Sequence, residues 1–167
     1  MLDIVFKKIP REDEKQLRNI IEVVLGAIER PEFFIPYEEW EMKKMFEEDY
    51  APLLGAYDGN KLVAMAQLYV DQQMLKEFKE VLNIADKRVC ELGGDLVLPE
   101  YRGQGLMFEM IQIQYEWAKE MGFDYIISMA HPDNIGSLKS LEKLGLKYVK
   151  TANVANGHLR DIYMLKI

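Results

Sequence analysis

The chain has 167 residues, 49% of them hydrophobic and 29% charged, and its 28 acidic and 21 basic side chains give a net charge of −7. This length and composition predict one domain over residues 1–167 with a hydrophobic core, and exclude a disordered tail or a disulfide-stapled miniprotein. A lone cysteine, no apolar run near the ~20 residues that cross a bilayer and a start without an apolar leader predict a cytoplasmic protein with no membrane partner.

The first hundred residues predict a strand, two amphipathic helices, a hairpin and another strand. Leu17 and Val24 lie on one face of the first helix, and Pro31 ends the helical pattern. Asp58-Gly59 is typical of a tight turn between antiparallel strands. The expected elements are a strand at 3–9, helices at 12–29 and 37–48, strands at 53–57 and 62–70, a short helix or inserted loop at 73–84, and a strand at 89–98.

The remaining residues predict alternating helices and strands. Gly122 and Gly145 follow the last apolar positions of two helices, and Asn156-Gly157 indicates a second hairpin. A β-α-β unit over 89–130 requires a right-handed crossover, so part of the sheet is parallel and the domain is a mixed α/β one. The expected elements are a helix at 104–121, a strand at 125–130, a helix from 133 or 134 to 145, and strands at 147–154 and 159–165.

A glycine loop between the strand at 89–98 and the following helix is the most informative segment. The first amides of a helix have no internal partners, and the helix dipole favours an anion there. Gly103 and Gly105 allow a diphosphate to approach the backbone, and Arg102 can guide it. A plain strand–helix turn would explain the same glycines. A Walker loop is absent, and Phe108 stands where a dinucleotide fingerprint needs its third glycine.

Two motifs resemble the GNAT superfamily of acyl-CoA-dependent N-acyltransferases. The element order also fits this family over nearly the whole chain. The resemblance implies a largely antiparallel mixed sheet of about seven strands, with one splayed parallel pair and helices on both faces. The family's Arg/Gln-x-x-Gly-x-Gly/Ala motif aligns with Arg102, Gly103, Gln104, Gly105, Leu106 and Met107, and its second motif matches Asn134, Ser137, Glu142, Lys143 and Gly145.

The resemblance implies acetyl-CoA as co-substrate. No metal is expected, because His131 and His158 are too few and too far apart in sequence to suggest a metal site. The pantetheine arm of acetyl-CoA would form hydrogen bonds with the backbone amides and carbonyls of Leu96 and Leu98, which are free where the two parallel strands splay apart. Its diphosphate would lie on the backbone amides of residues 103–107. Asn134 would line the pantetheine side and also cap its helix. The implied cofactor residues are Leu96, Val97, Leu98, Arg102, Gly103, Gln104, Gly105, Leu106, Met107, Asn134 and Ser137.

The sequence departs from the family pattern at two positions. Met107 stands where the motif has Gly or Ala, although its amide is still available. Leu141 replaces the tyrosine that in many members protonates the departing thiolate. Tyr101, Tyr148 and Tyr163 are possible substitutes, as is water, and the sequence does not rank them. The missing tyrosine also supports an alternative function, a CoA-binding sensor or interaction domain without turnover.

Glu91 is the first candidate for the general base that removes a proton from the acceptor amine. Several family members place a glutamate at this distance before the motif, and partial burial would raise its pKa to a useful range. Asp95 is the second candidate. Gly93-Gly94 inside a strand indicates a bulge or a close backbone approach, which would decide which carboxylate faces the amine.

The acceptor side is expected in the first hundred residues, which hold a net charge of −8. Acidic and aromatic side chains there favour a small cationic amine, and an acidic face in water is the simpler explanation. A nucleic-acid partner is not expected, because phosphate binding needs clustered basic residues. The protein is expected to be a monomer or a homodimer. The side chains concerned are Phe33, Phe34, Tyr37, Glu38, Glu39, Trp40, Glu41, Glu47 and Glu48.

Overall fold

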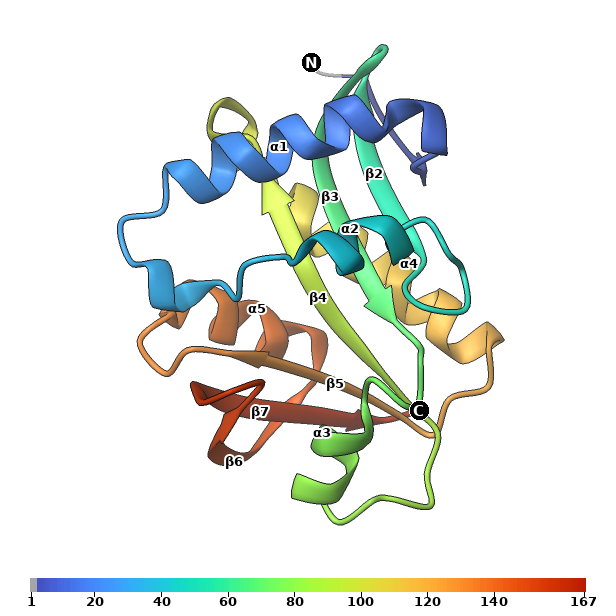
Figure 1. Cartoon of the computed structure of the whole chain (residues 1–167), viewed down its shortest axis with the longest axis vertical. Coiled ribbons are helices and arrows are strands. Elements are labelled where there is room, and N and C mark those ends of the chain that lie inside the picture. The colour runs from blue at the N-terminus through green and yellow to red at the C-terminus, as the bar shows by residue number, and fades with distance from the viewer. Residues whose placement is uncertain (1–2) are drawn as a thin grey trace.

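The computed structural model describes residues 3–167 and has a seven-stranded sheet at its centre (Figure 1). The strand order is β1-β2-β3-β4-β5-β7-β6, and only the β4–β5 pair is parallel. The expected mixed, largely antiparallel sheet is confirmed. The strands are β1 (Ile4–Lys8), β2 (Leu53–Asp58), β3 (Lys61–Tyr69), β4 (Val89–Val97), β5 (Tyr125–Ala130), β6 (Lys147–Val154) and β7 (His158–Lys166).

The helices lie within the ranges that the sequence predicts, and most are shorter. Helix α2 begins after a capping box between Glu38 and Glu41, and α5 ends where Gly145 adopts a φ of +101°. The ambiguous 73–84 segment contains a short helix. No helix within residues 3–167 has the length and apolar character needed to cross a bilayer. The helices are α1 (Glu14–Gly26), α2 (Glu39–Lys44), α3 (Lys76–Val81), α4 (Leu106–Glu120) and α5 (Ile135–Leu144).

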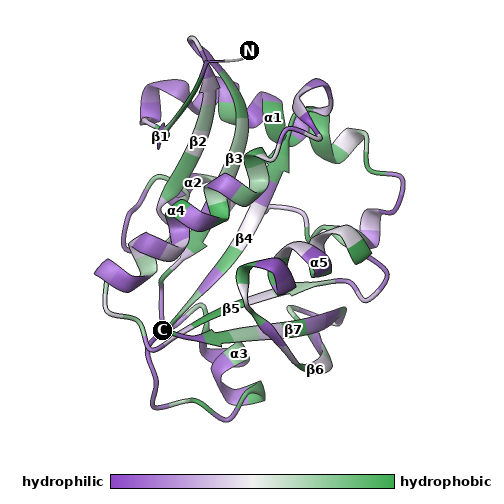
Figure 2. Ribbon diagram, turned by 180° about the vertical axis from the view of Figure 1, so that it is seen from behind, coloured by the Kyte–Doolittle hydropathy of each residue, from purple (hydrophilic) through white to green (hydrophobic). Residues whose placement is uncertain are grey.

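Helices cover both faces of the sheet. Figure 1 shows α1, α2 and α3 on the near face, and Figure 2, from behind, shows α4 and α5 on the other. The apolar sides of α1 and α4 pack on β2, β3 and β4, and the residues of β2 and β3 are almost all buried. Ile127 and Ile162 pack with α3 on one face, and Cys90 and Ile126 pack with α4 and α5 on the other. The sheet therefore separates two sets of buried side chains.

Near its middle, strand β4 leaves β5 and carries an irregularity in its pairing with β3. Its parallel pairing with β5 ends at Leu92 opposite Ser128, and the two ribbons diverge beyond that point (Figure 1). On the other side, Gly94 and Asp95 together oppose the single residue Ala66 of β3, which is a β-bulge. The expected bulge and splay are both present. They open the sheet at the position where the candidate site lies.

Candidate active site

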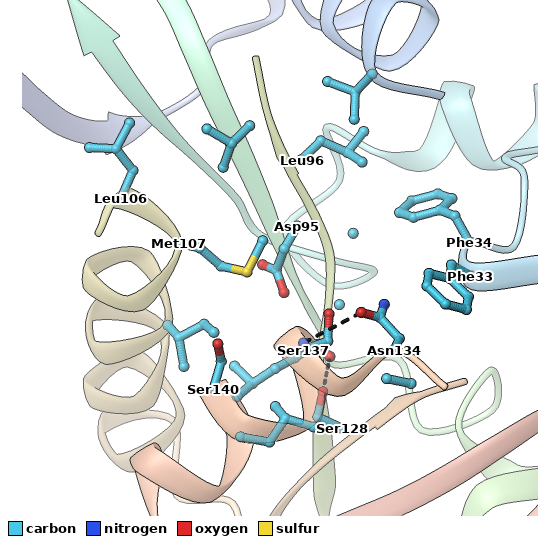
Figure 3. A pocket seen from close by; sticks show the side chains of 18 of the residues that line it. Phe33, Phe34, Asp95, Leu96, Leu106, Met107, Ser128, Asn134, Ser137 and Ser140 are labelled. Carbon is cyan, nitrogen blue, oxygen red and sulfur yellow. Dashed lines mark hydrogen bonds between the residues drawn. The ribbon is translucent and has the colours of Figure 1, made fainter. Parts of the chain in front are cut away.

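A cavity of about 510 Å³ opens where β4 and β5 diverge. It is lined by the end of β4, the glycine loop, the start of α4, the end of β5 and the start of α5, with parts of α1 and of the loop after it. Figure 3 shows Asp95 pointing into this cavity, with Leu106 and Met107 on the α4 side and Asn134 and Ser137 on the α5 side. The segments that the two motifs single out thus meet around one cavity.

The glycine loop presents free backbone amides to this cavity. Gly103 and Gly105 have φ angles of +75° and +80°, which glycine adopts without strain. No atom lies within 4 Å of the place where either would carry a Cβ. Gly105 precedes the first turn of α4, so the amides of Leu106, Met107 and Phe108 have no acceptor inside the helix. Open space, unpaired amides and the positive end of the helix dipole suit an anion.

Most of the residues implied for the cofactor line the first cavity. Leu98 and Gln104 do not, and Gln104 is exposed in the loop. The residues that line the cavity are Leu96, Val97, Arg102, Gly103, Gly105, Leu106, Met107, Asn134 and Ser137.

The prediction that the backbone groups of Leu98 are free is wrong. Its amide donates to the Val63 carbonyl of β3 at 3.0 Å. Because neighbouring peptide groups of a strand face opposite edges, Leu96 faces β3 as well, and Val97 faces the gap beside β5. The Val97 carbonyl accepts a hydrogen bond from Arg102 Nε at 3.4 Å. A ligand that adds to this edge of β4 would therefore meet the peptide groups of Val97.

Helix α5 brings two motif positions to the cavity. Asn134 caps the helix, because its side-chain oxygen accepts from the Ser137 amide at 3.5 Å. Leu141 is buried and lines the cavity, so no hydroxyl is present where many members of the resembled family have one. Ser137 and Ser140 are the nearest hydroxyls on this helix that line the cavity.

Of the three tyrosines considered as substitutes for Leu141, only Tyr101 lines the cavity. Its hydroxyl donates to Asp58 at 2.8 Å. Tyr148 is exposed on β6, and the Tyr163 hydroxyl donates to Glu142 at 3.2 Å. The structure therefore favours Tyr101 by position, but its proton is already held by a carboxylate.

A second cavity, of about 200 Å³, adjoins the first across the β4 bulge. Gly93 and Gly94 line both cavities, as do Phe33, Phe34 and Met129. Its walls are mainly aromatic and apolar, and its charged residues are Glu41, Glu91 and Arg160.

The acids and aromatics proposed for the acceptor side are only partly brought to this cavity. Phe33, Phe34, Tyr37 and Glu41 line it. Trp40 does not, and it is 49% exposed. The other acids have different partners: Glu38 accepts from Trp40 Nε1, Glu39 pairs with Arg18, and Glu48 pairs with Lys8.

The bulge separates the two candidate bases. Glu91 lines the second cavity and Asp95 lines the first. Burial, and then the nearby charge of Asp95, raise the pKa of Glu91 to about 8, although Arg160 lowers it in part. Burial raises the pKa of Asp95 to about 7, and its Oδ1 has no hydrogen-bond partner. The two carboxylates therefore lie at different cavities.

A buried amide holds two tyrosines at the second cavity, and the sequence analysis did not identify it. Gln67 of β3 is 1% exposed and accepts hydrogen bonds from Tyr37 at 2.7 Å and from Tyr69 at 2.9 Å. Burial raises the pKa of both phenols well above the usual value. The three side chains meet beside Gly94 only after β3, β4 and the loop before α2 have packed.

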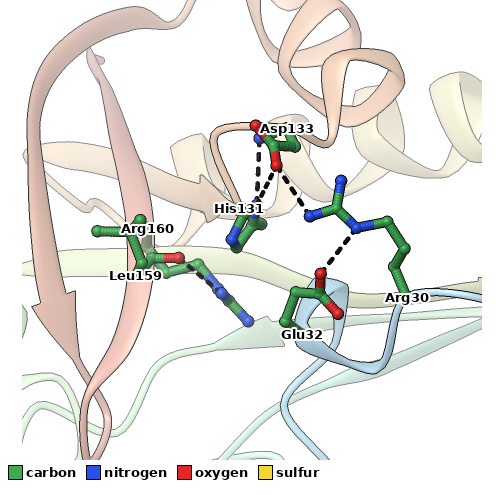
Figure 4. A network of polar contacts seen from close by, with 6 residues as sticks. All are labelled: Arg30, Glu32, His131, Asp133, Leu159 and Arg160. Carbon is green, nitrogen blue, oxygen red and sulfur yellow. Dashed lines mark hydrogen bonds and ion pairs between the residues drawn. The ribbon is translucent and has the colours of Figure 1, made fainter.

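Arg160 was also missed, although the sequence contained a signal for it. In the strand predicted at 159–165, Arg160 alternates with Ile162 and Met164, so a charged side chain occupies an inward position. It is 3% exposed, and its hydrogen bond is to the carbonyl of Leu159 at 2.7 Å. Figure 4 shows its side chain extending away from Asp133.

The loop between α1 and α2 is tied to the β5–α5 loop beside both cavities (Figure 4). Arg30 donates to Asp133 at 2.8 Å and to Glu32 at 2.7 Å. The Phe33 ring lies 5.4 Å from the His131 ring. These contacts hold Phe33 at the junction of the two cavities.

Cys90 lines neither of the two cavities. Cys90 is buried on the face of β4 opposite to Glu91. Burial raises the pKa of its thiol to about 12, which keeps the thiol protonated. Within residues 3–167, no group of three or more His, Cys, Asp or Glu side chains is arranged to hold a metal ion.

Solved structures with the same fold cover nearly the whole chain. The TM-score is 0.73 to an N-acetyltransferase from Staphylococcus aureus Mu50, at 17% identity over 98% of each chain. It is 0.69 to the ribosomal-protein-S18-alanine N-acetyltransferase from Escherichia coli, at 16% identity over 98% of this chain and 94% of that one. It is 0.77 to a chain of the NatC complex bound to Gag peptide and CoA, at 16% identity over 99% of each chain.

The sequence comparisons give the family. No curated protein matches the chain in sequence. The family model described as Acetyltransferase (GNAT) family matches residues 17–146, which include both motifs and every strand from β2 to β5. The chain therefore belongs to the GNAT family of acetyltransferases.

Proposed function

We propose that this protein is an N-acetyltransferase that moves an acetyl group from acetyl-CoA to the primary amine of a small molecule. The observation that carries the proposal is the junction of two cavities at the β4 bulge. One is walled by the glycine loop and the other contains Glu91. The cofactor and the amine would approach this junction from opposite sides, so the amine can attack the thioester directly.

The residues of the first cavity fit the chemistry of coenzyme A. The amides of residues 103–108 and the Arg102 guanidinium suit a diphosphate, and the Val97 peptide groups suit the amides of a pantetheine arm. The unpartnered Oδ1 of Asp95 is a further acceptor beside that arm. When bound, acetyl-CoA supplies an activated acyl carbonyl at the junction of the cavities.

Glu91 is the proposed general base. An amine with an ordinary pKa is mostly protonated near neutral pH, so it must lose a proton before attack. A carboxyl group with a pKa of about 8 is much better matched to an ammonium group than an exposed glutamate is. The acidic groups of Glu41 and Glu91 and the aromatic walls favour an acceptor whose amine arrives as an ammonium group.

Two further steps of the reaction are the stabilisation of the oxyanion, which we assign to the β4 bulge, and the protonation of the leaving group near Leu141. The bulge places one extra backbone unit opposite Ala66, and an amide freed from the ladder there is the proposed donor to the developing oxyanion. Leu141 has no proton to donate, so the thiol group leaves as a thiolate that takes its proton from water.

A thiol-release assay with acetyl-CoA and a panel of amines tests the function. Turnover with at least one primary amine, and loss of roughly 100-fold in Glu91→Gln, is the expected result. Calorimetric titration of CoA is run beside it. Binding of CoA without thiol release for any amine would instead support the sensor function that the missing tyrosine at Leu141 suggests.

A further inference from the structure

Arg160 and Glu91 lie on the same face of the sheet. Glu91 is paired with Ile127, and Ile127 with Met164, so these three side chains share one face. Side chains on a strand alternate between faces, so Arg160, four residues before Met164, points to that face too. Strand β7 is two strands away from β4, so the Cα atoms of Glu91 and Arg160 are about 10 Å apart across the sheet. The four residues from Met164 to Arg160 add a separation of roughly 13 Å along the strand direction. Both side chains line the second cavity.

The Arg160 guanidinium has little of its hydrogen-bonding capacity satisfied by the protein. An arginine has five N–H donors, and the bond from Arg160 goes to the neighbouring Leu159 carbonyl. No carboxylate of residues 3–167 lies within ion-pair distance of it. A charge buried to this degree is costly unless something pairs with it.

The charges of the cavity are therefore divided. Glu91 and Glu41 are acidic, and Glu41 is already engaged by the amide of Glu38 at 2.8 Å. Arg160 is the basic group that lines the same space. An acceptor with only an ammonium group would leave the arginine unpaired in the complex.

We propose that the acceptor is an amino acid, whose carboxylate binds the Arg160 guanidinium while its amine lies at the β4 bulge on the Glu91 side. This proposal rests on the proposed acetyl transfer and adds the substrate class to it. A planar guanidinium holds a carboxylate through two parallel hydrogen bonds, which fixes the direction of the amine toward the first cavity.

The lining of the cavity indicates the side chain of that amino acid. Besides its charged groups, the cavity is lined by Phe33, Phe34, Tyr69, Met74 and Phe78. Such a surface favours an apolar or aromatic side chain. We therefore expect phenylalanine-like and methionine-like acceptors to be better than acidic ones, which would place a second carboxylate against this wall.

The test compares matched acceptors in two variants. The acceptors are L-phenylalanine and L-phenylalaninamide, then L-methionine and L-methioninamide, because the carboxamide keeps the size and removes the charge. For each pair the ratio of kcat/KM, acid over amide, is measured with wild type, Arg160→Gln and Arg160→Lys. Arg18→Gln is the control, because it removes the same charge from the exposed side of α1.

In Arg160→Gln the ratio is expected to fall roughly 30-fold or more, since a desolvated charge pair loses one partner. Arg160→Lys is expected to keep part of the ratio, and Arg18→Gln all of it. An equal loss of acid and amide activity in Arg160→Gln would assign the arginine a structural role and overturn the proposal. If the wild type acetylates simple amines but neither amino acid, acetyl transfer stands and this inference fails. If no amine of either kind causes the wild type to release thiol from acetyl-CoA, both proposals fail.

Discussion

The Tyr37 hydroxyl lies 2.5 Å from the point where a Cβ of residue 94 would stand. Gln67 Oε1, to which this hydroxyl donates, lies 2.7 Å from the same point. Gly94 also has a φ of +62°, a conformation that other residues rarely adopt. The bulge between the two cavities therefore depends on the absence of a side chain at this position.

Gly94→Ala is expected to displace Tyr37 and Gln67 and to lower both stability and activity. We expect a loss of about 1–3 kcal/mol in the free energy of unfolding, from positive φ and overpacking together. Gly59→Ala is the matched control, because Gly59 has a φ of +59° and no atom within 4 Å of its Cβ position. Urea denaturation of both variants isolates the packing contribution, and equal losses would contradict a steric role for Gly94.

The pH dependence of turnover distinguishes the two candidate bases. If Glu91 is the base, kcat/KM rises with pH through about 8, and Glu91→Gln abolishes this rise. Asp95→Asn removes a charge that raises the pKa of Glu91, so the rise moves to lower pH. The same amine is used throughout, so that its own titration cancels. Loss of the rise in Asp95→Asn, with the rise intact in Glu91→Gln, would make Asp95 the base.

The partly buried position of Glu91 also makes stability depend on pH. Its folded pKa is raised to about 8 from a usual value of 4.5, so the fold favours the protonated form. The contribution of Glu91 is fully present below pH 4.5 and is lost as the pH rises through 8. Glu91→Gln should therefore be more stable than wild type at pH 8.5, by roughly 1–3 kcal/mol, and not at pH 4. Urea midpoints at both pH values measure this difference, and a constant one would contradict the argument.

Arg102 should contribute to cofactor binding through the diphosphate alone. Arg102→Gln is expected to weaken CoA binding roughly tenfold, less at high salt, because a charge-assisted hydrogen bond to phosphate is lost. Binding of pantetheine, which lacks the diphosphate, should not change. Calorimetry with both ligands measures this, and Arg88→Gln, which lies against the end of α4, is the control. An equal loss for the two ligands would place Arg102 elsewhere in the site.

The contact between Arg30 and Asp133 should affect the acceptor more than the fold. Both side chains are about half exposed, so the ion pair contributes little to stability. Arg30→Gln frees the loop that holds Phe33 at both cavities, so we expect KM for the amine to rise several-fold with little change in the unfolding midpoint. Steady-state kinetics beside thermal denaturation measures both quantities. A fall in stability with KM unchanged would contradict this role.

The order of elements and the glycine loop follow from local signals in the sequence. The hairpin at Asp58-Gly59, the end of α5 at Gly145 and the start of α4 after Gly105 each need a positive φ, which glycine provides. Helical and strand periodicities then predict the elements within a few residues. Leu98 shows the limit of this reasoning, because which edge of β4 is free depends on its pairing with β3.

Only the tertiary structure decided how the second cavity is built. Gln67 and Tyr69 belong to β3 and Arg160 belongs to β7, far away in the chain. The register of β3, β4, β5 and β7 places the three side chains on one face of the sheet. The bulge at Gly94 sends Glu91 and Asp95 to different cavities, although a regular strand would place residues four apart on the same face. The sequence by itself determined the glycine loop, because backbone conformation at glycines is a local property. Which charges meet at the second cavity depends on long-range strand pairing, because the alternation around Arg160 predicts an inward charge but not its neighbours on other strands.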